Sequence, residues 1–222
     1  MNIKKTLNRM YALLEAHFGD LGWWPAETDF EVVTGAILTQ NTSWKNVEKA
    51  IERLKQKDMI DPVAVKNVKL EELSQLIKPS GYHRVKARRL KTIAQFIIEN
   101  FEGSIKNMKS MKSERLRKML LSVNGVGPET ADSILLYAAG KPVFVVDAYT
   151  KRIFARHGIT DDEASYEDVQ SVVHSCVPKQ ARTYNQFHAL LVETAKNFCG
   201  KRKPLCEKCP LCIILPKCRG KN

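Results

Sequence analysis

Apolar side chains recur every three or four residues along most of the chain, which is the spacing of one face of an α-helix. The one strand-like run, residues 143–146, is short and has no partner of comparable quality, so we interpret it as a buried connector that enters a helix. The pattern predicts an all-α fold. Its three clearest stripes consist of Leu7, Met10, Tyr11, Leu14 and Phe18; Trp44, Val47, Ile51 and Leu54; and Leu90, Ile93, Ala94, Ile97, Ile98 and Phe101.

Capping residues and chain breakers mark where these helices begin and end. Asp61 and Pro62 read as an N-cap followed by proline at the first helical position. Residues 79–81 break the chain before the helix through Leu90, and residues 140–142 end the helix that holds Leu135 and Tyr137. We expect further helices over residues 114–121, 148–156, 166–176 and 183–198.

Composition narrows the class of protein. The chain has 222 residues, 44% of them apolar, which suffices for one large or two small domains with a buried core. No run approaches the roughly 20 apolar residues of a membrane span, and no secretory signal is evident, so we expect a cytoplasmic protein. The 36 Lys and Arg residues against 24 acids leave a net charge of +12, which predicts a polyanionic partner, most often nucleic acid.

Five cysteines crowd the C-terminal end: Cys199, Cys206, Cys209, Cys212 and Cys218. Disulfides are rare in a reducing compartment, so a metal site is the better explanation. Zinc prefers two separated cysteine pairs, whereas one crowded loop suits a [4Fe–4S] cluster held by four thiolates. Either Cys212 or Cys218 can supply the fourth thiolate. Cys176, by contrast, reads as an ordinary buried thiol on a helix face.

A glycine-containing turn joins two expected helices at residues 121–131. Gly125 and Gly127 permit backbone angles closed to other residues, and Pro128 fits the first position of the next helix. Such a turn directs free amides outward and offers a seat for a phosphate. A turn that only packs two helices together is the alternative.

Asp147 follows an apolar run and opens the next helix, twenty residues beyond Gly127. Aspartate is a favoured N-cap, which gives it a purely structural role. A carboxylate at the mouth of an apolar pocket can also stabilise an oxocarbenium-like transition state and orient water. Both interpretations stand at this stage.

Together, the hairpin Leu-x-x-x-Gly-Val-Gly-x-x-Thr-Ala, the Val-Asp pair and the cysteine cluster resemble the endonuclease III superfamily of DNA glycosylases over about residues 23–218. The resemblance implies two packed helical domains with duplex DNA and a flipped base between them. Residues 25–141 would form a six-helix barrel carrying the hairpin. Residues 1–24 and 142–222 would hold the iron–sulfur cluster and the catalytic aspartate. We expect a monomer acting on nucleoid DNA.

The same resemblance assigns roles to individual residues. Asp147 matches the essential aspartate, and Gln40 matches a glutamine that probes the space left by the flipped base. Three cysteines match cluster ligands, but the usual fourth position is Leu215 here, so a loop insertion reaching Cys218 is preferred, with Cys212 as the alternative. The DNA-binding candidates are Gln40, Asn41, Tyr82, Gly125, Val126, Gly127 and Thr130, and the metal candidates are Cys199, Cys206, Cys209 and Cys218.

The chain departs from the pattern of the bifunctional members at one position that determines the reaction. Glu129 stands where bifunctional members carry the lysine that forms a Schiff base with the sugar, which implies a monofunctional glycosylase. The alternatives are a bifunctional endonuclease III-type glycosylase and lyase for oxidised pyrimidines, using another lysine such as Lys151, or a mismatch-specific glycosylase. A non-catalytic DNA-binding scaffold with a structural cluster is a further alternative.

The segments around Trp23-Trp24-Pro25, residues 36–42 and residues 78–82 resemble the 3-methyladenine glycosylase branch. A methylated purine is cationic, so an aromatic pocket attracts it by stacking and cation–π interaction. The base-pocket candidates are Trp23, Trp24, Trp44, Glu129 and Tyr149. Each tryptophan can equally be a core residue.

Overall fold

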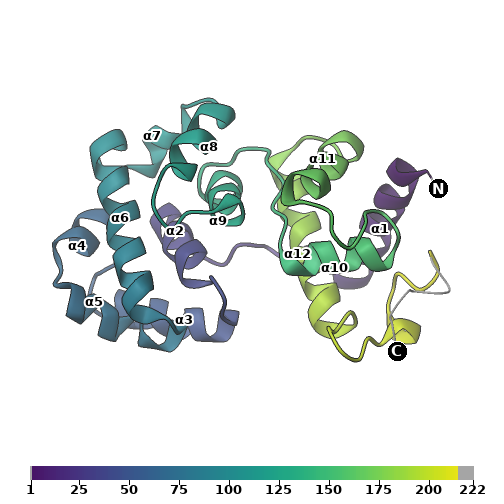
Figure 1. Ribbon diagram of the computed structural model, residues 1–222, viewed down its shortest axis with the longest axis horizontal. Helices are drawn as coiled ribbons and strands as arrows, with labels where there is room; N and C mark the ends of the chain where they lie inside the picture. The colour runs from purple at the N-terminus through teal and green to yellow at the C-terminus, as the bar shows by residue number, and fades with distance from the viewer. Residues whose placement is uncertain (1, 215–222) are drawn as a thin grey trace. The chain divides into compact units, whose positions relative to one another are not determined.

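The computed structural model describes residues 2–214, and all regular structure in that range is helical (Figure 1). The all-α prediction is therefore confirmed. The α-helices are α1 (Ile3–Phe18), α2 (Asp29–Leu38), α3 (Trp44–Lys55), α4 (Pro62–Asn67), α5 (Leu70–Leu76), α6 (His83–Phe101), α7 (Ile105–Lys109), α8 (Ser113–Leu121), α9 (Pro128–Ser133), α10 (Ala148–Arg156), α11 (Tyr166–Cys176) and α12 (Ala181–Asn197). Two 3₁₀ turns, η1 (Lys78–Ser80) and η3 (Cys206–Lys208), and a π-helical turn, η2 (Ile134–Ala138), complete the set.

The chain divides into two compact units. The hairpin unit is Trp24–Lys141, and the terminal unit combines Met1–Trp23 with Pro142–Asn222. Each unit has its own buried core.

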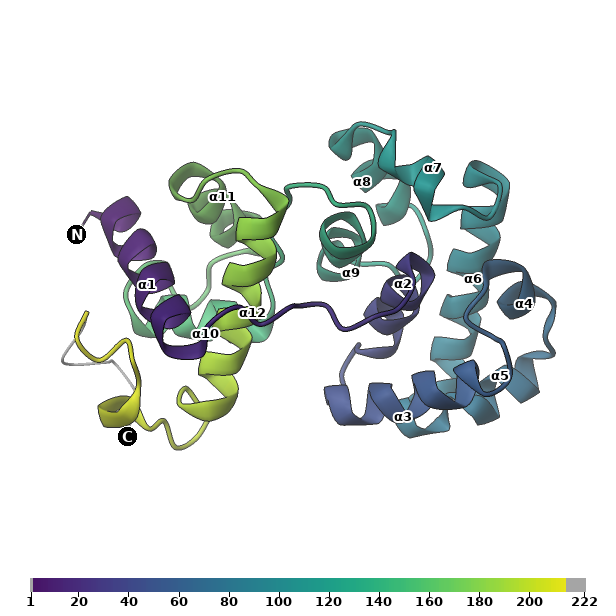
Figure 2. The same cartoon turned by 180° about the vertical axis from the view of Figure 1, so that it is seen from behind.

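The hairpin unit is built around α2, which contacts α3, α6, α9 and η2 (Figure 1). Every residue of α2 from Phe30 to Leu38 is buried, as expected of a helix enclosed on all sides. The long α6 packs against α4 and α5 (Figure 2), and the predicted stripe Leu90, Ile93 and Ile97 is fully buried there. Burial of this apolar area is what holds the short helices α4 and α5 in place.

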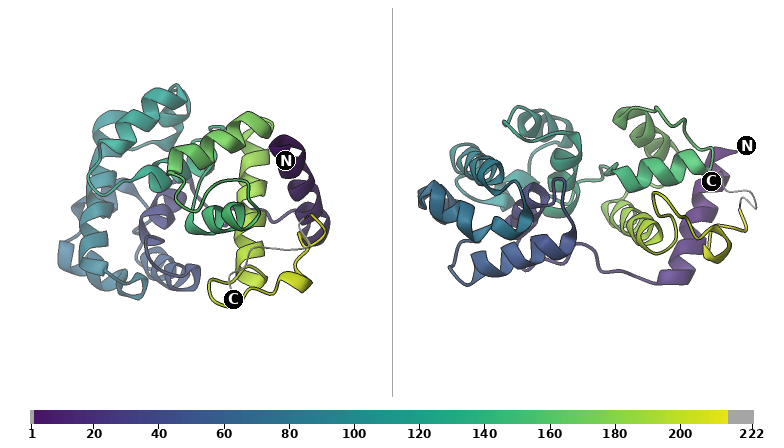
Figure 3. Two further views of the ribbon diagram at one scale, coloured as in Figure 1. Left: turned by 45° about the vertical axis from the view of Figure 1, so that its right-hand side comes forward. Right: turned by 60° about the horizontal axis from the view of Figure 1, so that its bottom comes forward.

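The terminal unit is built around α12, which contacts α1 and α10. Both views of Figure 3 show α1 beside α12. Of the predicted stripe in α1, Leu7, Met10 and Leu14 are fully buried, whereas Tyr11 and Phe18 are half-buried. Apolar burial on one face of α1 thus joins the first residues of the chain to its C-terminal half.

Residues 143–146 form the buried, extended connector that the sequence predicts. Side chains of α11 bind its backbone: Phe144 N donates to His174 Nε2 at 3.0 Å, and Gln170 Nε2 donates to Phe144 O at 2.7 Å. These bonds replace the strand partner that the run lacks. The connector therefore delivers Asp147 to the start of α10 in a fixed position.

The helix boundaries agree with the signals in the sequence at several points. Asp61 Oδ1 accepts from the amides of Val63 and Ala64 at 2.8 and 2.9 Å, with Pro62 at the first helical position. Helices α10 and α11 have the predicted limits, whereas α12 begins two residues before the predicted start. Within residues 2–214, no helix is long and apolar enough to cross a membrane.

Candidate functional site

The glycine turn predicted at residues 121–131 lies between α8 and α9. An ion pair inside the hairpin locks the two helices together: Arg117 Nε and Nη2 donate to Asp132 Oδ1 and Oδ2 at 2.7 and 3.1 Å. Asp132 is fully buried, and the two bonds give each of its carboxylate oxygens a donor. Val126 and Thr130 are buried beneath the turn, while Gly127 is exposed at the start of α9.

The two glycines of the turn differ. Gly125 has φ +86°, and a Cβ there would lie 2.5 Å from Cγ of Arg89, so both conformation and space require glycine. Gly127 has φ −92° and ψ 179°, which is extended backbone, and a Cβ there would meet nothing within 4 Å. The prediction that both positions need glycine for their backbone angles is therefore right for Gly125 and wrong for Gly127.

Gln40 lies just beyond the C-terminal end of α2 and is bonded to the hairpin. Its Nε2 donates to Gly125 O and to Thr130 Oγ1, both at 3.0 Å, and its Oε1 accepts from Arg89 Nη1. The side-chain amide is thus engaged at both ends. Its proposed role in probing DNA stays a prediction, and it would require release of these bonds. Arg89, which touches both Gln40 and Gly125, was not anticipated from the sequence.

Two exposed turns of the hairpin unit carry Asn41 and Tyr82. Both residues have left-handed backbone, with φ +53° and +45°, and the Tyr82 side chain is 72% exposed. Buried Lys86 ties the two turns together, since its Nζ donates to Leu38 O at 2.8 Å and to Ser80 O at 2.7 Å. Burial, with Arg89 nearby, lowers the pKa of Lys86 to about 8.

Lys86 was missed in the sequence because lysine is ordinarily a surface residue. It nevertheless occupies the apolar face of α6, four residues before Leu90, and that placement was the available signal. Lys86 is a positioning residue for the turns that present Asn41 and Tyr82.

An aromatic cluster occupies another part of the hairpin unit. The rings of Trp24 and Trp44 meet edge to face with centroids 4.9 Å apart, and Tyr137 lies 5.1 Å from Trp24 at a tilt. Gly35 of α2 allows the close approach, because a Cβ there would lie 3.0 Å from Trp24. The structure thus brings two predicted base-pocket residues together and adds Tyr137, which the sequence argument did not single out. Glu129 is exposed in the first turn of α9.

The remaining two base-pocket candidates, Trp23 and Tyr149, belong to the terminal unit. Each has a cation over its ring: Lys196 Nζ lies 5.5 Å from the centroid of Trp23, and Arg152 lies 5.2 Å from that of Tyr149. These rings therefore already use one face for a cation–π interaction.

Asp147 is the N-cap of α10. Its Oδ1 accepts from Thr150 N at 2.7 Å, and its Oδ2 lies 3.6 Å from Nε2 of buried His188. Burial alone would raise the pKa of Asp147, but His188 and the Thr150 amide outweigh burial and lower it. The carboxylate is therefore held ionised while its side chain keeps 15% exposure.

His188 is a functional candidate that the sequence argument missed. It lies on α12, and its pairing with Asp147 spans 41 positions of the chain, a separation that helical periodicity does not reveal. Lys151, the lysine considered for a Schiff base, donates from Nζ to Ala164 O at 2.8 Å.

The first cysteine of the C-terminal loop is fixed by two arginines of α10. Arg152 Nε donates to Cys199 O at 2.9 Å, and Arg156 Nη1 donates to Gly200 O at 2.9 Å and to Cys199 Sγ at 3.0 Å.

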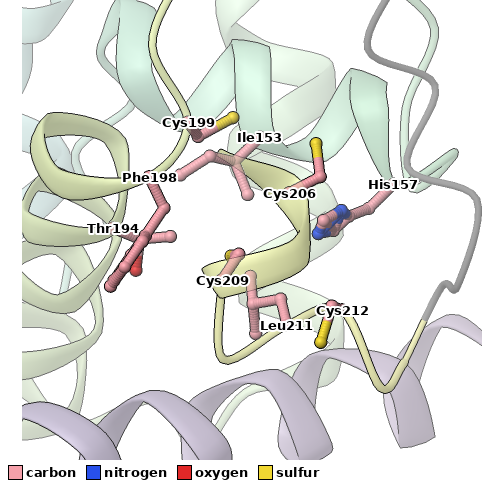
Figure 4. A pocket seen from close by; sticks show the side chains of 9 residues that line it. All are labelled: Ile153, His157, Thr194, Phe198, Cys199, Cys206, Cys209, Leu211 and Cys212. Carbon is pink, nitrogen blue, oxygen red and sulfur yellow. The ribbon is translucent and has the colours of Figure 1, made fainter. Parts of the chain in front are cut away.

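Four cysteines, Cys199, Cys206, Cys209 and Cys212, line one small cavity (Figure 4). Within the described residues, no three His, Cys, Asp or Glu side chains meet closely enough to hold a single metal ion. Burial, together with the neighbouring cysteines, raises the pKa of the Cys209 thiol to about 11. Cys218 and Leu215 lie outside the described residues, and Cys176 is not part of the cavity wall.

This donor set fits an iron–sulfur cluster better than a single ion. A [4Fe–4S] cluster takes its four thiolates at separated corners, whereas one ion needs them at one point. Iron would also stabilise the buried thiolates that burial alone disfavours.

The comparisons with known proteins agree with one another. The model of the HhH-GPD superfamily of base excision DNA repair proteins matches residues 34–179. A protein of Methanocaldococcus jannaschii named as a DNA repair glycosylase is 49% identical over 91% of this chain and 92% of its own length.

Two solved structures are similar along most of the chain. A trapped covalent intermediate of endonuclease III with DNA has TM-score 0.84 and 26% identity, covering 99% of this chain and 97% of that one. The 3-methyladenine DNA glycosylase of H. pylori, bound to 1,N6-ethenoadenine, has TM-score 0.76 and 29% identity, covering 88% and 98%.

Proposed function

The chain belongs to the HhH-GPD superfamily of base excision DNA repair proteins, the superfamily of endonuclease III, and on this premise we propose that it is a monofunctional DNA glycosylase for alkylated purines. DNA glycosylase activity follows from the family. Its reaction type and substrate are inferred from the residues of this chain.

The observation that carries the proposal is the ionised, half-buried Asp147. Its pKa is lowered by His188 and the Thr150 amide, so the negative charge is present at neutral pH in a water-poor position. Such a charge is worth more there than in solution, since the local dielectric is low. It is suited to a sugar that becomes positively charged as its base departs.

The reaction then needs no covalent enzyme intermediate. The N-glycosidic bond breaks, and the base leaves with the bonding electron pair. The Asp147 carboxylate stabilises the positive charge that develops on the sugar. A water oxygen bonds to C1′, and Asp147 orients that water and accepts its proton before release to solvent. The products are a free base and an intact abasic strand.

We infer the absence of lyase chemistry from the lack of a suitable lysine amine for a Schiff base within the described residues. Glu129 has no amine with which to form a Schiff base, and the Lys151 amine is bonded to Ala164 O. The endonuclease III structure similar to this chain was trapped as a covalent complex with DNA. We propose that this chain differs from it in that step.

The substrate class is inferred from the aromatic cluster. Trp24, Trp44 and Tyr137 present π-faces and edges in one group, which suits a flat, cationic base. The H. pylori relative was solved with 1,N6-ethenoadenine, an alkylated adenine, bound. A methylated purine is already a good leaving group, so a single carboxylate suffices for its release.

DNA is the expected partner, in agreement with the net charge of +12 and with DNA-bound structures of similar proteins. We propose that the exposed start of α9 binds a backbone phosphate through its free amides. Asn41 and Tyr82 would contact DNA from the turns that Lys86 fixes.

We further propose that Cys199, Cys206, Cys209 and Cys212 hold a [4Fe–4S] cluster. Support comes from their shared cavity and from Arg156 beside the Cys199 sulfur. Cys218 is the alternative fourth ligand. When bound, such a cluster would cross-link the loop and supply electron-transfer chemistry, whereas base release depends on Asp147.

The test is a panel of duplexes carrying an alkylated purine, an oxidised pyrimidine, uracil or a mismatch. We expect free base from the alkylated duplex, and strand breaks only after alkali. Borohydride should trap no protein–DNA adduct. Trapping together with release of oxidised pyrimidines would instead establish a bifunctional enzyme. Release from mismatches alone would make it a mismatch glycosylase, and no release from any duplex would favour a binding scaffold.

A further inference from the structure

One buried histidine of the terminal unit, His157, takes no part in the proposed reaction. His157 is the C-cap of α10 and is only 5% exposed. Among the described residues, neither of its ring nitrogens has a hydrogen-bond partner. An imidazole carries at least one N–H donor in every protonation state, and a buried donor without an acceptor is costly. The position therefore calls for an acceptor.

The other two buried or half-buried histidines of this unit have partners. His174 Nε2 accepts from Phe144 N, and His188 Nε2 faces the Asp147 carboxylate. Within residues 2–214, His157 therefore differs from His174 and His188 in lacking a polar partner, not in being buried.

The surroundings of His157 are the wall of the cysteine cavity. His157 lines the same cavity as the four cysteines, and Figure 4 shows its ring next to Cys206, with Cys212 farther along the wall. Ile153, Phe198 and Leu211 make the rest of that wall largely apolar, and the hydroxyl of Thr194, which also lines it, donates to Leu190 O at 2.7 Å. Sulfur atoms are accordingly the main acceptors available to the ring within the cavity.

We propose that His157 donates a ring N–H hydrogen bond to a sulfur atom of the iron–sulfur cluster, either a bridging sulfide or a ligating thiolate. This inference rests on the cluster assigned above to the four cysteines. Reduction adds negative charge that spreads over the sulfurs, so a donor stabilises the reduced state more than the oxidised state. His157 therefore raises the reduction potential of the cluster.

The same bond gives His157 a positioning role. It connects the end of α10 directly to the cluster, in addition to the contacts that Arg152 and Arg156 make with the start of the loop. A change in cluster charge would then alter this hydrogen bond at the C-terminal end of α10, the helix that Asp147 caps.

The experiment compares the cluster in wild type, His157→Leu and His157→Gln, with His17→Phe as the control. Leucine fills the apolar cavity without a donor, glutamine restores an N–H, and His17 is exposed on α1 and not among the cavity-lining residues. Iron content and thermal stability establish that each variant is folded and loaded. The midpoint potential is then measured by protein film voltammetry, and nitrogen coupling to the reduced cluster by pulsed electron paramagnetic resonance.

We expect a lower potential in His157→Leu, partial recovery in His157→Gln and no change in His17→Phe. Weak nitrogen coupling should be present in wild type and lost in His157→Leu. An unchanged potential in His157→Leu would overturn the inference, and so would the strong coupling of a nitrogen bound directly to iron. Wild-type protein that contains no iron would overturn both the cluster and this inference. Base release from alkylated duplex, measured separately on wild type, tests the proposed reaction on its own.

Discussion

Helices α9 and α10 begin in opposite ways. At the start of α9, Gly127 offers no side-chain cap, is exposed, and has open space where a side chain would lie. At the start of α10, Asp147 caps the helix with its own carboxylate, which is bonded to Thr150 N and faces His188. One helix start is open, and the other is filled by an anion of the protein.

In the proposed function, the attraction of a helix N-terminus for an anion serves DNA binding at α9 and catalysis at α10. A helix N-terminus has free amides and a partial positive charge, so it attracts an anion. Under the proposed function, the open start of α9 takes that anion from DNA. The filled start of α10 instead helps to keep Asp147 ionised, and a charge held in this way is available to the reaction.

The largest expected effect follows from neutralising the anion at α10. Asp147→Asn keeps a capping side chain, so folding should be preserved, while base release should fall a hundredfold or more, about 3 kcal/mol in barrier. Single-turnover base release measures this directly. Asp61→Asn, which makes the same change at the capping aspartate of α4, serves as the matched control. Base release at the wild-type rate in Asp147→Asn would mean that Asp147 serves only as a helix cap.

The next effect concerns the turn that presents the open helix start. Gly125→Val places a branched side chain at φ +86° against Arg89, so we expect a loss of about 1–3 kcal/mol in the free energy of unfolding. Binding to every duplex should weaken, whatever its sequence. Chemical denaturation and fluorescence anisotropy provide the two readouts. Gly127→Ala is the control and should be nearly silent in stability; equal destabilisation by both variants would refute the distinction between the two glycines.

A smaller effect is expected from filling the open start. Gly127→Asp installs a carboxylate cap without a steric clash, so the stability of the protein should hold or rise by a few tenths of a kcal/mol. Duplex binding should weaken about tenfold at low salt, because like charges meet, and less at high salt. Gly127→Asn caps equally well without the charge and should bind more tightly than Gly127→Asp. Equal binding by the two variants would show that no phosphate approaches this position.

The smallest effect comes from removing His188. Since burial is the largest influence on Asp147 and acts to raise its pKa, His188→Leu should move that pKa upward from its lowered value. The acidic limb of the pH–rate profile should therefore shift to higher pH. The stability contributed by Asp147 is present above its ordinary pKa of 3.8 and lost as pH falls through the lowered value, so acid unfolding should also begin at higher pH. His188→Gln keeps a hydrogen-bond donor, so it should shift the acidic limb less than His188→Leu does. An acidic limb that does not move in His188→Leu would show that His188 does not stabilise the Asp147 carboxylate.

Local signals carried most of the fold prediction. The capping pair Asp61-Pro62, the apolar stripes and the limits of α10 and α11 all depend on residues a few positions apart, and each agrees with the structure. The same locality identified Asp147 as a cap. Capping and periodicity are properties of short segments, so a single sequence displays them.

Contacts between residues far apart in the sequence could not be predicted from such local signals. Arg89 meets Gln40 across 49 positions, Gln40 meets Gly125 across 85, and His188 meets Asp147 across 41. The roles of the two hairpin glycines depend on such a partner, because Arg89 is what crowds Gly125 and spares Gly127. Tertiary packing decides these contacts, and periodicity does not encode them.

The most direct test of the account is to measure affinity and saturating rate together in the double variant Gly127→Asp/Asp147→Asn, on one duplex carrying an alkylated purine. If the two helix starts do separate work, the double variant should have the affinity of Gly127→Asp and the single-turnover rate of Asp147→Asn, because independent sites act additively in free energy. The account would be contradicted if Gly127→Asp alone lowered the saturating rate, or if Asp147→Asn alone weakened binding as much as Gly127→Asp.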